Sequence, residues 1–147
     1  EHGVYVAHCP ESNLNLSSGI APIRKFLEEG IAVGLGSDVA GGTSLSMAKA
    51  LTLAVQVSKM YWRLIDENSK PLTFAEAFYL ATAGGGSYFG KVGTFLDGYE
   101  FDAVVVEDQL AGDIREYTPV QRTERMMYDE STMTICAKYV AGCVCEL

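Results

Sequence analysis

Two short polar segments carry the residues of this chain that could hold a metal ion or move protons. The first is His8-Cys9-Pro10-Glu11-Ser12-Asn13, and the second is Gly36-Ser37-Asp38-Val39-Ala40-Gly41-Gly42. Each segment directly follows a short apolar run. Asp38 gives the sharper signal, because a carboxylate at the end of an apolar strand is costly unless it is paired or bound to a metal. Such a carboxylate can ligate zinc or transfer a proton, so Asp38 is the candidate catalytic residue.

Simpler roles are open for the same side chains. Asp38 could cap the next helix or end the strand, and the ring of His8 could hydrogen-bond a backbone carbonyl instead of a ligand. Cys9 is a poor candidate nucleophile, because it needs an adjacent base and His8 projects to the opposite side of an extended chain.

The elements around these segments predict a strand–helix–strand unit. The apolar runs 4–8 and 31–36 are typical of strands, and the second suits a parallel strand buried on both faces. Between them we expect a helix that begins after Ser17 or Ser18 and ends before Gly30. The carboxyl ends of parallel strands share one edge of a sheet, so His8 and Asp38 should lie at the same edge.

The rest of the chain changes character near residue 90. A long helix is expected over about 44–65, and a capping box at Thr73 and Glu76 predicts the start of another. The three glycines at 84–86 are interpreted as a turn between domains. Beyond them we expect strands at 101–106, 134–140 and 143–145 and a short helix at 118–127. The predicted domains are 1–90 and 91–147. The long helix should bury one stripe of residues: Met47, Leu51, Ala54, Ser58, Tyr61 and Ile65.

Composition narrows the function classes. The 147 residues include 11 Lys and Arg against 19 Asp and Glu, a net charge of −8, which argues against general nucleic-acid binding. No apolar run approaches the ~20 residues of a membrane span. The four cysteines (Cys9, Cys136, Cys143 and Cys145) form no CxxC pair, so we expect free thiols and a cytoplasmic protein.

The two polar segments also carry a family resemblance. The run Ala7-His8-Cys9-Pro10-Glu11-Ser12-Asn13 contains an HCPxSN motif that aminohydrolases and chlorohydrolases share. The continuation Asp38-Val39-Ala40-Gly41-Gly42 resembles the guanine deaminase family of the amidohydrolase superfamily. The resemblance implies an α/β fold: the last two parallel strands and helices of a (β/α)₈ barrel, followed by part of a small β domain.

The resemblance also implies a site. It makes Asp38 a zinc ligand and catalytic residue, and it places His8, Ser12 and Asn13 at the substrate pocket or its rim. The family's remaining zinc ligands belong to sequence before residue 1, so the chain by itself should hold no stable zinc and show no activity. The implied substrate is guanine. Open strand edges further predict a homo-oligomer.

Two alternatives are open. The chain could belong to another aminohydrolase or chlorohydrolase of the superfamily, since most residues that recognise the purine lie outside this chain. It could instead be a non-catalytic domain that acts by self-association.

Overall fold

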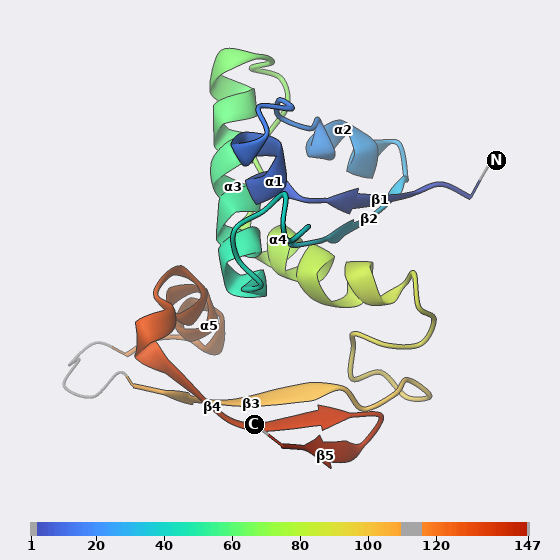
Figure 1. Ribbon diagram of the computed structural model, residues 1–147, viewed down its shortest axis with the longest axis vertical. Coiled ribbons are helices and arrows are strands. Elements are labelled where there is room, and N and C mark those ends of the chain that lie inside the picture. Colours follow the sequence, from blue (N-terminus) through green and yellow to red (C-terminus); the bar gives the residue numbers. More distant parts are fainter. Residues whose placement is uncertain (1–2, 110–115, 147) are drawn as a thin grey trace.

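The computed structural model describes residues 3–109 and 116–146 of the chain. These residues form two parts, each with its own sheet (Figure 1). The first part packs helices against a two-stranded sheet. The second part, drawn in orange and red, contains a three-stranded sheet and one helix that reaches back toward the first.

The predicted strand–helix–strand unit is present. Strand β1 (Tyr5–His8) pairs in parallel with β2 (Ala32–Leu35), with Tyr5 opposite Ala32 and His8 opposite Leu35. Helix α2 (Ile23–Glu28) makes the crossover that two parallel strands require. Gly30 follows the helix with a φ of +73°, the left-handed conformation that glycine adopts without strain.

The start of this crossover differs from the prediction. Helix α2 begins at Ile23 with Pro22 at its N-cap, and neither Ser17 nor Ser18 caps it. Proline has no N–H and keeps the preceding residue out of the helical region, so the helix does not extend back through Ala21. Helix α1 (Pro10–Asn15) was not predicted from the sequence. The proline at its first position and the acidic residue in its first turn were the available signals.

Helix α3 (Met47–Leu64) runs the length of the first part, as predicted. Ser46 caps it by accepting a hydrogen bond from the Lys49 N–H. The expected stripe is wrong at its two ends, because Met47 and Ile65 are exposed. The buried residues lie in the N-terminal turns of the helix, between positions 48 and 57: Ala48, Ala50, Leu51, Thr52, Ala54, Val55 and Val57.

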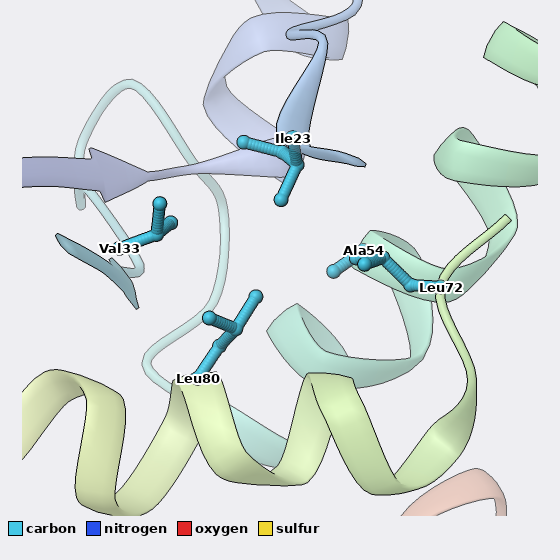
Figure 2. Close-up of a cluster of buried hydrophobic side chains, with 5 residues drawn as sticks. All are labelled: Ile23, Val33, Ala54, Leu72 and Leu80. Carbon is cyan, nitrogen blue, oxygen red and sulfur yellow. The ribbon is translucent and has the colours of Figure 1, made fainter. Parts of the chain in front are cut away.

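A small apolar core joins the elements of the first part. Side chains from α2, β2, α3 and the segments around α4 meet in one cluster (Figure 2). Every member is at most 3% exposed, so this cluster excludes water between the sheet and its helices. Its members are Ile23, Val33, Ala54, Leu72 and Leu80.

Helix α4 (Phe74–Tyr79) begins with the predicted capping box of Thr73 and Glu76. It continues through the π-helical turn η1 (Leu80–Gly84) as far as residue 86, so interpreting the three glycines as a turn was wrong. They permit close packing instead: a Cβ on Gly86 would lie 2.3 Å from the Val92 carbonyl oxygen. The chain reverses only at 87–90.

The second part forms the predicted antiparallel sheet, in the order β3 (Ala103–Asp108), β4 (Met133–Val140), β5 (Cys143–Cys145). Helix α5 (Pro119–Tyr128) and the 3₁₀ turn η2 (Glu130–Thr132) precede β4. Met127 of α5 packs against the α3 and α4 cluster of Leu51, Val55 and Ala77. This helix therefore connects the two parts, while a domain boundary near residue 90 stays a prediction.

All four cysteines are free thiols, as expected. Within residues 3–109 and 116–146, no helix combines the length and the apolar character needed to cross a bilayer.

Candidate functional site

The two polar segments leave the same edge of the β1–β2 sheet. His8 and Leu35 end the paired strands side by side, and the Gly36 N–H donates to the His8 carbonyl oxygen at 3.0 Å. The parallel pairing therefore brings the start of α1 next to the loop that carries Asp38, as the sequence predicts.

Asp38 and Ser12 meet at this edge. Asp38 lies three residues beyond β2 with a φ of +46°, and its side chain is exposed. The hydroxyl of Ser12, a buried residue of α1, donates to Asp38 Oδ2 at 2.5 Å. Among the described residues nothing donates to Oδ1. One carboxylate oxygen of Asp38 therefore accepts a hydrogen bond, and the other is available to a ligand.

Gly41 passes directly over this pair. A Cβ at Gly41 would lie 2.6 Å from Asp38 Oδ2 and 2.8 Å from Ser12 Oγ. A larger residue at Gly41 would displace the ends of these two side chains and disturb their hydrogen bond, so glycine at this position leaves room for the pair.

His8 lies in a different environment. Its ring is only 2% exposed and lines a small hollow together with Pro10, Asn13 and Val57. Neither ring nitrogen has a hydrogen-bond partner among the described residues, so His8 does not bond to Asp38. Burial lowers the pKa of His8 from 6.5 to about 4, so the ring is neutral at physiological pH.

Asn13 lines the same hollow as His8, on the side of α1. Its backbone N–H donates to the Cys9 carbonyl oxygen at 3.1 Å as part of the helical turn. The four candidate residues therefore divide into two pairs: Ser12 with Asp38 at the loop, and His8 with Asn13 beneath α1.

The Cys9 thiol has the properties of an unreactive cysteine. Burial, and then the charge of Asp38, raise its pKa, so the thiolate is disfavoured. This agrees with the prediction that Cys9 is a poor candidate nucleophile.

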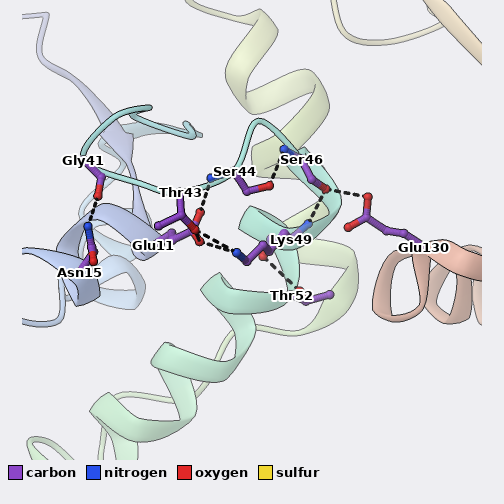
Figure 3. Close-up of polar contacts among 9 residues, drawn as sticks. All are labelled: Glu11, Asn15, Gly41, Thr43, Ser44, Ser46, Lys49, Thr52 and Glu130. Carbon is purple, nitrogen blue, oxygen red and sulfur yellow. Dashed lines mark hydrogen bonds and ion pairs between the residues drawn. The ribbon is translucent and has the colours of Figure 1, made fainter.

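Four polar residues next to the site were not singled out from the sequence. Glu11 and Asn15 of α1, Thr43 of the loop and Lys49 of α3 form hydrogen bonds that tie the loop to the two helices (Figure 3). Glu11 occupies the variable position of the HCPxSN motif, and Lys49 belongs to no motif. The acidic residue in the first turn of α1 was the only local signal.

The described residues do not supply a complete set of metal ligands. No group of three or more His, Cys, Asp or Glu side chains within residues 3–109 and 116–146 could hold one. A catalytic zinc site takes about three protein ligands. The open oxygen of Asp38 fits one ligand position, and the others would have to come from outside the described residues.

The chain is similar to known proteins in its sequence and its fold. The amidohydrolase family model matches residues 1–144. The human guanine deaminase is 46% identical over 115 residues, which is 76% of this chain and 25% of the human protein. The structure of a guanine deaminase from C. acetobutylicum with bound guanine aligns with a TM-score of 0.87 and 42% identity, over 97% of this chain and 34% of that one.

A more distant structure gives the same fold. A variant of the atrazine chlorohydrolase TrzN from Arthrobacter aurescens, complexed with zinc and atraton, aligns with a TM-score of 0.67 and 25% identity, over 97% of this chain and 31% of that one. The chain thus spans about a quarter to a third of the relatives it matches. These similarities confirm the family resemblance and the α/β fold class. The chain belongs to the amidohydrolase family.

Proposed function

We propose that this chain is part of a zinc-dependent guanine deaminase, which hydrolyses guanine to xanthine and ammonia. The observation that carries the proposal is the alignment with the guanine-bound enzyme over 97% of the chain at 42% identity. The chlorohydrolase shares only 25% of the aligned residues, so guanine is favoured over another heterocycle.

Within this proposal Asp38 is the zinc ligand and the proton acceptor. A bound zinc ion would make water nucleophilic near neutral pH. Asp38 Oδ2 already accepts from Ser12, so the exposed Oδ1 is the atom free to bind the metal and to take a proton. The oxygen of the attacking water would form a bond to the carbon of guanine that bears the amino group. The proton would then pass to that amino group, so the C–N bond breaks and ammonia leaves.

Ser12 has a supporting role. Its hydroxyl fixes one carboxylate oxygen and thereby limits the rotation of the Asp38 side chain. Because a misplaced ligand costs transition-state stabilisation, a fixed orientation is part of the proposed chemistry. Asn13 and His8 would not bind the metal. They would instead line the small hollow next to α1.

The test is the substitution Asp38→Asn in the enzyme that contains this chain. The amide keeps the shape of the side chain but removes its charge, so kcat should fall by roughly 10²- to 10⁴-fold, with a lower zinc content and an unchanged melting temperature. Ser12→Ala is the matched variant and should lower kcat much less. Near-normal turnover of Asp38→Asn with full zinc would contradict the assignment.

A further inference from the structure

The loop that carries Asp38 is held from two sides by helices. We call residues 38–45 the Asp38 loop; it joins β2 to α3. On one side, the Asn15 side chain of α1 donates to the Gly41 carbonyl oxygen at 2.8 Å (Figure 3). On the other side, Lys49 of α3 reaches toward the loop and also toward α1.

Glu11 is the centre of these contacts. Its Oε1 accepts from the Thr43 hydroxyl and from Lys49 Nζ, and its Oε2 accepts from the Ser44 N–H at 3.2 Å. The Glu11 side chain is only 14% exposed. The hydrogen bonds from Lys49 and Thr43 lower its pKa, so the carboxylate is charged at neutral pH. One side chain therefore connects α1, the Asp38 loop and α3.

The Asp38 loop has little else to hold its tip. Residues 38–40 are all exposed, so they gain little from packing. Inside the loop, the Gly42 N–H donates to the Asp38 carbonyl oxygen at 2.6 Å, which shapes the turn but does not attach it to the rest of the protein. The attachments are the Ser12 hydroxyl, the Asn15 amide, the contacts of Glu11 and the hydrogen bond from Lys49 to Thr43.

We propose that Glu11 and Lys49 are positioning residues, which fix the Asp38 loop and thereby keep the Asp38 carboxylate against Ser12. Neither residue reaches Asp38 itself, so both act through the loop. The inference rests on the proposed function only for the role of Asp38. Since Glu11 stands at the variable position of the HCPxSN motif, the motif alone does not supply this contact.

The test combines hydrogen exchange with guanine turnover in the enzyme that contains this chain. Glu11→Gln and Lys49→Met each remove one charge of the pair with little change in size. We expect amides of the Asp38 loop to exchange roughly tenfold faster in both variants, because the loop opens more often. We expect kcat to fall by about tenfold with KM within twofold, at an unchanged melting temperature.

Two further variants separate positioning from a general effect of charge. Lys49→Arg keeps the cation and should keep both the slow exchange and the turnover. Glu29→Gln is the matched control, because Glu29 is an exposed partner of Lys25 at 3.8 Å on α2, away from the loop. It should change neither measurement.

Three results would overturn the inference. Unchanged exchange in the Asp38 loop of both variants would show that the pair does not hold it. Faster exchange with normal kcat would show that holding the loop does not position Asp38. Loss of kcat in Glu29→Gln would show an effect of charge alone. If the unmodified enzyme does not deaminate guanine, the proposed function fails, and exchange alone decides whether the pair holds the loop.

Discussion

Acidification from pH 7 toward pH 4 should destabilise this protein through His8. The ring is 2% exposed, its nitrogens have no partner among the described residues, and burial lowers its pKa from 6.5 to about 4. The unfolded chain takes up a proton at His8 near pH 6.5, whereas the folded protein does not until about pH 4. Stability from the neutral ring is therefore present above pH 6.5 and is lost as the pH falls toward 4.

The size of this effect follows from the two pKa values. A difference of one unit corresponds to about 1.4 kcal/mol, so the free energy of unfolding should fall by about 2 kcal/mol between pH 7 and pH 4.5. Urea unfolding at half-unit pH steps measures this slope. His8→Leu removes the titrating group while keeping an apolar side chain of similar reach, and it should flatten the curve over this range.

The stability of His8→Leu at pH 7 provides a control for this experiment. His8→Leu removes two buried ring nitrogens that have no partner in the described part of the chain, so the stability at pH 7 should be unchanged or higher. His2 is present in both proteins, and its titration cancels in the comparison. Equal pH slopes for the two proteins, or an imidazole resonance of His8 that titrates near pH 6.5, would refute the reasoning.

Further predictions concern the packing of the first part and its assembly. Arg24→Met removes two hydrogen bonds to Glu76 and two to the carbonyl oxygens of Lys70 and Pro71. The hydrogen bond from Arg24 is the largest cause of the lowered Glu76 pKa, which is about 2. We expect a loss of about 1 kcal/mol at pH 7 from the ion pair, reduced by solvent screening, and this part of the loss should disappear as the pH falls from 4.5 toward 2, measured by urea unfolding. Leu80→Ala should cost about 2–5 kcal/mol in the same assay, because Leu80 is fully buried, and a smaller loss would mean that the site collapses. Gly86→Ala should cost about 2 kcal/mol through its clash with the Val92 carbonyl, and no loss would contradict the close packing. The isolated 147-residue chain should sediment as a dimer or larger, and a monomer at high concentration would show that its strand edges are covered.

Local patterns were enough for most of the elements. The apolar runs predict both parallel strands, since continuous apolar stretches are typical of strands buried on both faces. The Thr73 and Glu76 capping box predicts the start of α4, because its hydrogen bonds involve only residues three apart. Parallel pairing then places the His8 and Asp38 segments at one edge without further information.

Contacts between distant segments account for the errors. The glycines at 84–86 look like a turn in sequence, but a Cβ at Gly84 or Gly86 would lie 2.8 Å from the Val33 carbonyl oxygen or 2.3 Å from that of Val92. Close backbone packing therefore favours glycine at these two positions of the helix. The exposed ends of α3, at Met47 and Ile65, depend on where the neighbouring helices stop. Helical periodicity shows which residues share a face, but it does not show how far a partner covers that face.

Residue types at short and regular spacing are enough to predict the α/β class and the family resemblance and to select Asp38 as the candidate catalytic residue, a role that stays a prediction. Which groups these residues meet depends on the tertiary structure. It places Ser12 rather than His8 on the Asp38 carboxylate, since α1 turns the Ser12 hydroxyl toward the loop while the His8 ring is buried beneath the helix. It also joins Glu11 to Lys49 across 38 positions of sequence, a contact that exists because α1 and α3 pack together.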